Sequence, residues 1–135
     1  MKELTVDAKP ESLVDIKAFV GAELEAAGCP EGTRKQLYVV IDEIFGNIAN
    51  YAYEGASGSA SVRIETEAEP RAVVLTFLDS GFPFNPLTTE TPDTSLKARE
   101  RKIGGLGIFM VRRLTDEVSY EYADGMNVLR AMKRF

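Results

Sequence analysis

Histidine is absent from this chain of 135 residues, and cysteine occurs once, at position 29. Without histidine the chain has no imidazole that could act as a general base, bind a metal or accept a phosphate. A lone cysteine cannot form an intramolecular disulfide, and the cysteine clusters that bind structural zinc are lacking. We therefore expect Cys29 to be a buried or half-buried thiol without a chemical role.

Long apolar runs are also missing. No stretch approaches the roughly 20 apolar residues that a membrane-spanning helix needs. The N-terminal sequence MKELTVDAKPES lacks the apolar centre of a secretory signal peptide. With 44% apolar and 27% charged residues, the composition is that of an ordinary soluble globular protein, and the length fits one domain over residues 1–135. We expect a cytoplasmic protein that does not contact a membrane.

Positive charge is in short supply, since the net charge is −5. This balance argues against a protein that binds nucleic acid directly. The basic residues nevertheless gather in two local clusters, Lys97, Arg99, Arg101 and Lys102, and Arg130, Lys133 and Arg134. Such clusters suit a phosphate or an acidic partner better than a long polyanion, and a solvated basic face is the alternative.

The periodicity of apolar residues predicts a strand, two helices and a hairpin in the first part of the chain. Residues 2–8 alternate loosely, as a strand does, and Pro10 opens a helical pattern with apolar residues on one side. The sequence AGCPEG interrupts this pattern, and a second helix is predicted from about Thr33 to Tyr53. Two paired strands are predicted at 59–69 and 70–81, the second apolar enough to be central in a sheet.

The second part of the chain begins with a polar segment, 88–103, that predicts a long loop. A short helix with glycines at its head follows over 104–116, and then a hairpin over 117–134 that turns at Asp124-Gly125. This order of elements predicts an α/β (α+β) two-layer sandwich, in which helices pack on one face of a mixed, mostly antiparallel sheet.

Three polar residues, Glu43, Asn47 and Asn50, interrupt the apolar pattern of the second predicted helix. Their spacing of i, i+4 and i+7 places a carboxylate and two amides on one helix face. Because an unpaired buried amide costs roughly 1–3 kcal/mol, these groups should face a cavity, a metal or solvent. Glu43 and Asn47 could serve one site, where the amide oxygen binds a cation such as Mg²⁺ and the carboxylate accepts a proton. A merely solvent-exposed face is the alternative.

The sequence LDSGFPFNP places Asp79 at the end of an apolar strand and Gly81 in the turn after it. A carboxylate at a strand end can accept a hydrogen bond from an exocyclic amine such as that of adenine. Gly81 permits the close approach of a flat ligand to the backbone. An ordinary Asp-x-Gly turn is the alternative.

Gly104, Gly105 and Gly107 fall together at the start of the apolar helix in KIGGLGIFMVRRL. A glycine inside a helix costs about 0.5–1 kcal/mol relative to alanine, so the cluster suggests that the backbone approaches something closely. The free N–H groups and positive dipole of a helix N-terminus can hold phosphates. The pattern is neither a Walker P-loop nor a Rossmann fingerprint. A flexible hinge is the alternative.

The three features together, in this order, resemble the ATP-binding domain of the GHKL superfamily, the Bergerat fold. Glu43 and Asn47 match its N box, Asp79 and Gly81 its first glycine box, and the three later glycines its second. Within the superfamily the chain is most similar to the bacterial anti-sigma-factor serine/threonine kinases, which are often only this domain. The resemblance covers nearly all of the chain and includes the segments DEIFGNIANYAY, DSGFPFNPL, GGLGIFMVRRLTDEVSY and DGMNVLRAMKR.

The resemblance implies ATP and Mg²⁺ as cofactors. Asn47 would bind the Mg²⁺ that bridges the phosphates, and Glu43 would act as base or orienting group toward a serine or threonine hydroxyl. Asp79 would bind the adenine amine, and Gly81 would let the base lie against the backbone. The phosphates would be wrapped by a lid and helix N-terminus that contain Gly104, Gly105 and Gly107.

Three further positions follow from the same resemblance. Asn127, in GMNVL, matches a position near the base where the family has a small polar residue. A basic lid residue, Arg99 or Arg101, could neutralise charge during transfer, which matters because phosphoryl transfer depends on positioning and electrostatics. Asn85 departs from the family, since many members have aspartate there.

The implied partner is an anti-sigma-antagonist protein with a STAS domain, and such kinases also bind a sigma factor. The alternative is a catalytically inactive, nucleotide-gated regulator that sequesters a partner, and a plain ATPase is a third reading. Glu43 favours the kinase, because nucleotide binding alone needs no carboxylate there. Members commonly dimerise, and residues 2–28 could supply the interface of a homodimer.

Overall fold

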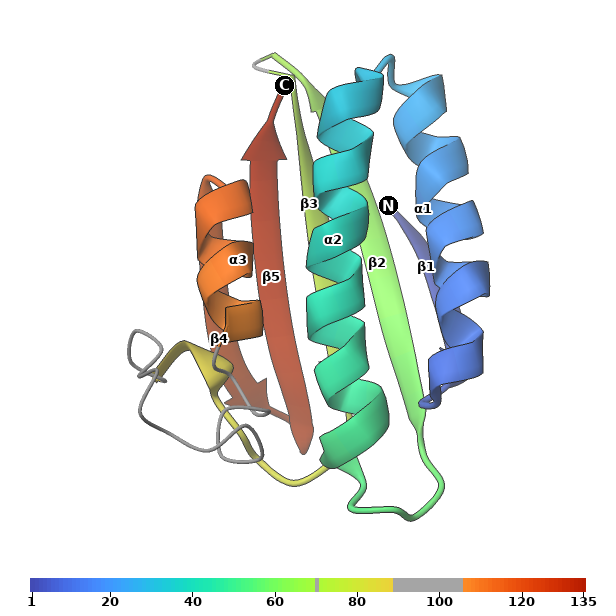
Figure 1. Cartoon of the computed structure of the whole chain (residues 1–135), viewed down its shortest axis with the longest axis vertical. Coiled ribbons are helices and arrows are strands. Elements are labelled where there is room, and N and C mark those ends of the chain that lie inside the picture. The colour runs from blue at the N-terminus through green and yellow to red at the C-terminus, as the bar shows by residue number, and fades with distance from the viewer. Residues whose placement is uncertain (70, 89–105) are drawn as a thin grey trace.

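A single five-stranded sheet forms one layer of the molecule (Figure 1). The structure is a computed structural model, and it describes residues 1–69, 71–88 and 106–135. Within these residues the strand order is β1-β2-β3-β5-β4, and every neighbouring pair is antiparallel. The strands are β1 (Lys2–Asp7), β2 (Ser59–Ala68), β3 (Arg71–Asp79), β4 (Glu117–Ala123) and β5 (Met126–Arg134).

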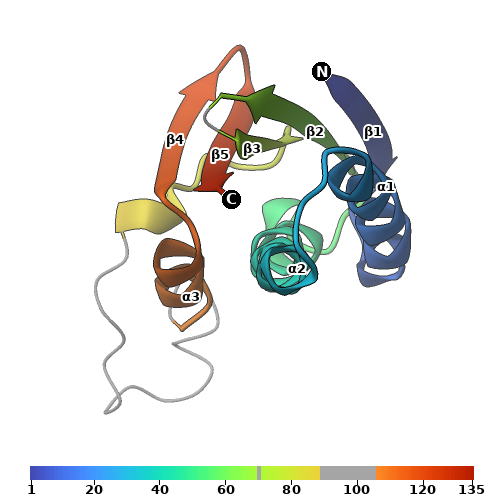
Figure 2. The same cartoon turned by 90° about the horizontal axis from the view of Figure 1, so that it is seen from above.

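The helices form the second layer and cover one face of the sheet (Figure 2). They are α1 (Leu13–Ala26), α2 (Glu31–Asn47) and α3 (Leu106–Leu114), and short helical turns η1 (Pro10–Ser12) and η3 (Pro86–Thr88) flank them. The backbone of α2 continues without a break as a π-helix, η2 (Ile48–Ala52). The two-layer sandwich predicted from the sequence is confirmed, and the described sheet is wholly antiparallel.

The core lies between the two layers, beneath α2. Alternation along β3 turns Val73, Leu75 and Phe77 toward the helices, where all three are buried. In α2, Ile41 and Phe45 recur on the face that packs against them. The strand that the sequence predicted as central is central, because β3 pairs with both β2 and β5.

The hairpin of β4 and β5 turns as predicted. Asp124 and Gly125 both have positive φ, 54° and 75°, which a two-residue hairpin turn of the type I′ class requires. Asparagine, aspartate and glycine tolerate this conformation best.

Several predicted boundaries shift by a few residues, and the third helix, for example, ends at Leu114 rather than at residue 116. The second helix begins at Glu31 rather than near Thr33, and its last five residues before Tyr53 are π-helical. The predicted polar loop and the glycines at 104 and 105 lie largely outside the described residues. Among the described helices, none is long and apolar enough to cross a membrane.

Candidate functional site

Asp79 and Asn127 face each other across two neighbouring strands at the end of the core. Asp79 is the last residue of β3 and pairs in register with Asn127, the second residue of β5. Alternation places Asp79 on the same face as the core residue Phe77, beneath the C-terminal end of α2. The two residues are only 5% and 8% exposed. Buried polar groups of this kind need hydrogen-bond partners.

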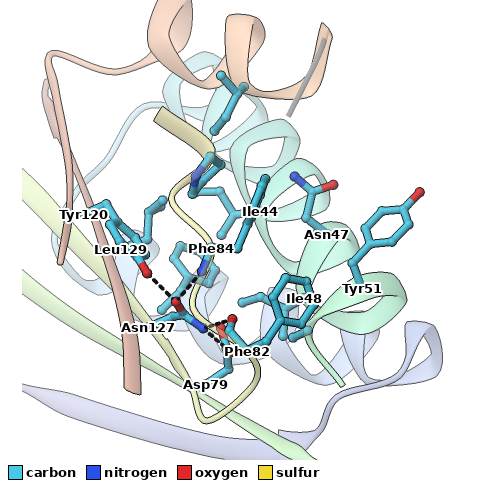
Figure 3. Close-up of a pocket in the computed structure, with 14 residues that line it drawn as sticks. Ile44, Asn47, Ile48, Tyr51, Asp79, Phe82, Phe84, Tyr120, Asn127 and Leu129 are labelled. Carbon is cyan, nitrogen blue, oxygen red and sulfur yellow. Dashed lines mark hydrogen bonds between the residues drawn. The ribbon is translucent and has the colours of Figure 1, made fainter. Parts of the chain in front are cut away.

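Asn127 uses both ends of its amide (Figure 3). Its Nδ2 donates to Oδ1 of Asp79 at 3.0 Å and to the carbonyl oxygen of Phe82 at 3.0 Å. Its Oδ1 accepts from the backbone N–H of Phe84 at 3.1 Å and from the hydroxyl of Tyr120. Burial raises the pKa of this hydroxyl above its ordinary value, so Tyr120 remains a protonated donor.

Gly81 fixes the turn from the other side. Its N–H donates to Oδ1 of Asp79 at 2.9 Å, and the next N–H, of Phe82, donates to the carbonyl oxygen of Ala52 at 3.1 Å. A Cβ at position 81 would overlap that oxygen and lie 2.6 Å from the Ala52 carbonyl carbon. Because these atoms are backbone, they cannot move aside, and only glycine fits.

Tyr53 joins the end of the π-helix to the same turn. Its hydroxyl donates to the carbonyl oxygen of Ser59 at 2.6 Å and accepts from the N–H of Ser80 at 2.9 Å. A Cβ on Gly58 would overlap the Tyr53 ring. The turn after Asp79 is therefore held at Ser80 by Tyr53 and at Phe82 and Phe84 by Asn127.

These elements surround an inner pocket whose walls are mostly apolar. Its apolar lining includes Ile44, Ile48, Phe77, Ile108 and Leu129. Its polar lining residues are Asp79, Asn127 and Tyr120, together with Asn47 and Tyr51. Phe82 and Phe84 line it from the turn, with ring centroids 6.4 Å apart. The volume is about 60 Å³. Ligand pockets typically measure about 300–1,000 Å³, so a purine would enter only with movement of side chains such as the half-exposed Phe82.

An outer groove adjoins this pocket along α2. It is lined by Asp42, Glu43, Gly46, Asn47, Asn50 and Tyr51. Asn47 and Tyr51 line both cavities, so the apolar pocket and the polar groove adjoin each other at these two residues. Asn50 is exposed, and its Nδ2 donates to the carbonyl oxygen of Gly46 at 2.8 Å. The polar stripe thus borders the outer groove through Glu43, Asn47 and Asn50, and Asn50, which lies in η2, is also exposed to solvent.

Glu43 lies against the first turn of α3. A Cβ added to Gly107 would overlap Oε2 of Glu43 and lie 3.3 Å from its Cδ. The absence of a side chain at 107 lets the α3 backbone approach this carboxylate. Gly104 and Gly105, together with Arg99 and Arg101, lie outside the described residues.

The profile of the family described as histidine kinase-like ATPase domain matches residues 6–133. The chain belongs to this family. Its membership implies ATP as the ligand of the fold.

Named relatives of this histidine kinase-like ATPase domain include serine-protein kinases called RsbW. The one from Listeria monocytogenes is 24% identical over 130 residues, which is 93% of this chain and 82% of that protein. The one from Bacillus cereus is 22% identical over 129 residues, 94% of this chain and 81% of that protein. A chain of the crystal structure of the SiaB–SiaC complex from Pseudomonas aeruginosa aligns with a TM-score of 0.60 at 20% identity. That alignment covers 98% of this chain and 89% of the other, and it shows a shared fold.

Five of the eight predicted site residues lie in this ATPase-domain site, namely Glu43, Asn47, Asp79, Gly107 and Asn127. Asn47, Asp79 and Asn127 line the inner pocket, while Glu43 lines the outer groove and contacts Gly107. Gly81 is not among the described residues that line the inner pocket. Its role is to shape the turn beside the pocket.

Sequence reasoning missed Tyr120 and Phe84, which contact Asn127. Alternation along β4 could have found Tyr120. It places 118 and 120 on the core side, and Tyr120 pairs in register with the pocket residue Leu129. No local pattern marks Phe84, because its contact is a backbone N–H.

The donor set suits Mg²⁺ only when phosphates complete it. Among the described residues there is no cluster of three or more histidine, cysteine, aspartate or glutamate side chains that could hold a metal alone. Mg²⁺ commonly takes one or two protein oxygens together with substrate phosphates and waters. Asn47 is half-buried where pocket and groove meet, and its amide points away from Asp79 and Asn127 (Figure 3). An oxygen in this place fits that mode of binding.

Proposed function

We propose that this chain is an ATP-dependent protein serine/threonine kinase of the anti-sigma-factor type. The observation that carries the proposal is that the inner pocket and the outer groove adjoin each other and share Asn47 and Tyr51 as lining residues. An apolar pocket with one buried carboxylate suits a purine base. The adjoining groove, which contains Glu43, suits the phosphates and the acceptor hydroxyl. The kinase names of the RsbW relatives support the same activity.

The base is proposed to bind in the inner pocket. Asp79 would accept a hydrogen bond from the exocyclic amine of adenine, and its burial strengthens that bond because water is excluded. Ile44 and Ile48 on one side and Leu129 on the other offer apolar contact to the faces of the base.

The triphosphate is proposed to run along the outer groove. Asn47 would hold Mg²⁺ there with the phosphate oxygens, and the metal would neutralise phosphate charge during transfer. The N-terminal turn of α3, with Gly107 and the preceding Gly104 and Gly105, would donate backbone N–H groups to the phosphates.

Glu43 is proposed to act on the acceptor. The serine or threonine oxygen attacks the γ-phosphorus, and the bond to the β,γ-bridging oxygen breaks, so that ADP leaves. The hydroxyl proton passes to the Glu43 carboxylate, or Glu43 orients the hydroxyl while the proton leaves later. The half-buried position of Glu43 beside Gly107 supports this role.

The proposed acceptor is a STAS-domain anti-sigma antagonist, with a sigma factor as a second, bound partner. A homodimer through residues 2–28 is part of the proposal. It is supported by the edge position of β1 and by Val14 of α1, whose side chain is 73% exposed. A cytoplasmic location belongs with these partners.

The test is transfer of label from γ-labelled ATP and Mg²⁺ to STAS-domain proteins of the same genome, with the purified chain as enzyme. We expect the wild type to label one of them, and Glu43→Gln to reduce the rate by about 100-fold or more, as loss of a general base commonly does. Glu31→Gln is the matched control, because Glu31 lies at the other end of α2, where it pairs with Lys35.

Two results would contradict the kinase. One is binding of ATP without label in any STAS protein, which would favour the nucleotide-gated regulator. The other is phosphate release at full rate without a partner, which would favour a plain ATPase. Equal rates for Glu43→Gln and Glu31→Gln would remove Glu43 from the mechanism.

A further inference from the structure

The amide of Asn127 has no hydrogen-bonding capacity left for a ligand. An asparagine side chain offers two N–H donors and an oxygen with two lone pairs. Asp79 and the Phe82 carbonyl take the two donors, with the Gly81 carbonyl a third, more distant acceptor at 3.4 Å. The Phe84 N–H and the Tyr120 hydroxyl take the two lone pairs.

The backbone fixes which end of the amide faces Asp79. The carbonyl of Phe82 can only accept, and the N–H of Phe84 can only donate. A flipped amide would set its oxygen against the Phe82 carbonyl and its NH₂ against the Phe84 N–H. The observed orientation therefore presents a donor to Asp79.

Asp79 uses only one of its two carboxylate oxygens in hydrogen bonds to the protein residues that the structure describes. Its Oδ1 accepts from Nδ2 of Asn127 at 3.0 Å and from the N–H of Gly81 at 2.9 Å. In the described part of the chain no donor reaches Oδ2. Because Asp79 lines the inner pocket, the oxygen left for a ligand is a pure acceptor held in one orientation.

We propose that Tyr120 and Asn127 are positioning residues that make the inner pocket select a purine with an exocyclic amine. They do so by binding Oδ1 of Asp79 to the protein and leaving Oδ2 for the amine. The proposal rests on the proposed function, since it requires ATP to bind here with its base against Asp79.

Tyr120 has the more indirect part. Its hydroxyl fills the second lone pair of Asn127 Oδ1, and its ring lines the inner pocket. Tyr120→Phe keeps the ring and removes the hydroxyl. The Asn127 side chain then loses one of the hydrogen bonds that fix its orientation, so its Nδ2 holds Oδ1 of Asp79 less firmly.

The experiment compares ADP with purine riboside diphosphate, which is ADP without the 6-amino group. Titration calorimetry with Mg²⁺ measures both dissociation constants for wild type, Tyr120→Phe, Asn127→Asp and Tyr122→Phe. Tyr122 lies two residues along the same strand, is 48% exposed and does not line the inner pocket, so it is the matched control.

We expect the wild type and Tyr122→Phe to prefer ADP by about 10- to 100-fold, the worth of one hydrogen bond to a buried carboxylate. Tyr120→Phe should bind ADP more weakly by about 3- to 10-fold and purine riboside diphosphate almost unchanged, as loss of one neutral hydrogen bond suggests. Asn127→Asp has the same shape but sets a carboxylate oxygen against Asp79 and the Phe82 carbonyl, so its preference for ADP should vanish.

The readout separates positioning from a merely structural role. A structural role would weaken both ligands equally and keep their ratio, and that result with Tyr120→Phe would overturn the inference alone. A wild type that binds neither ligand would overturn the proposed function as well. If Asn127→Asp does not fold, as its thermal melt would show, Tyr120→Phe decides the question by itself.

Discussion

At position 107 a single methyl group would overlap the carboxylate of Glu43. The overlapped atom is the end of a flexible side chain, so the carboxylate can swing aside at little cost in stability. Alanine also favours a helix over glycine by up to about 1 kcal/mol. We therefore expect Gly107→Ala to melt no lower than the wild type, yet to transfer phosphate at least about tenfold more slowly, the effect of misplacing a catalytic group.

Gly32→Ala is the control for this change. Gly32 lies in α2, and an added Cβ there meets no atom within 4 Å. It should raise the melting temperature slightly and leave transfer unchanged. If Gly107→Ala keeps the wild-type rate of transfer, the position of Glu43 against α3 has no bearing on catalysis.

At the scale of the element, the end of α2 decides where the turn after Asp79 lies. The π-helix η2 places the Ala52 carbonyl against Gly81 and Phe82, and Tyr53 then bonds Ser59 and Ser80. Tyr53→Phe removes two hydrogen bonds and leaves the Ser80 N–H without its observed partner. We expect it to lower the free energy of unfolding by about 1–2 kcal/mol.

Urea unfolding measures that loss, and titration with ADP measures its effect on the pocket. Affinity should fall along with stability, because the strand end that carries Asp79 is no longer fixed at Ser80. Tyr38 is half-buried in α2, well before η2 and Tyr53 in the sequence, and Tyr38→Phe serves as the comparison. An unchanged affinity in Tyr53→Phe would mean that Asn127 alone fixes the turn.

The elements were predictable from the sequence wherever one periodicity held throughout. The alternation in β2, the 3.6-residue period in α2 and the Asp124-Gly125 turn each depend on neighbours in the chain. The change to a π-helix at Ile48 was not predictable, because it goes with contacts to Gly81 and Phe82, far along the chain.

The residues of the candidate site likewise fall into those that could be predicted from the sequence and those that could not. Asp79 and Asn47 were found because a polar residue in an apolar pattern is visible in the sequence. Tyr120 was not found, since its hydroxyl acts on Asn127 only after β4 and β5 have paired.

At the scale of the whole molecule, Arg71 ties together three segments at the end remote from the site. Its Nη2 donates to the carbonyl oxygens of Ala27 and Gly28, at 3.0 and 2.9 Å. Its guanidinium lies over the ring of Phe135, 5.1 Å from the centroid, and its carbonyl accepts from the Phe135 N–H. Cys29, next to this junction, is 2% exposed, as the sequence led us to expect.

Cys29 should therefore report opening of this end of the molecule. Burial raises the pKa of its thiol above the ordinary value of 9.0, so at pH 8 the thiolate is scarcer than in a free cysteine, and its share grows as the pH rises. We expect reaction with a thiol reagent to be at least about 100-fold slower than in the urea-unfolded chain, and faster in Arg71→Ala than in the wild type. Arg63→Ala, which breaks only an exposed pair with Glu3, is the control. If Cys29 reacts in the native protein as fast as in the unfolded chain, the contacts of Arg71 do not keep this end of the molecule closed.

The most direct test of the account is titration calorimetry of the chain with a non-hydrolysable ATP analogue and Mg²⁺, repeated on Asp79→Asn. Asparagine keeps the shape of the side chain but sets an NH₂ group where the adenine amine needs an acceptor, or against the donors from Gly81 and Asn127. We predict micromolar binding by the wild type, a loss of about 10- to 100-fold or more in Asp79→Asn, and no loss in Asp124→Asn, where asparagine suits the turn. Equal affinity in wild type and Asp79→Asn would contradict the account.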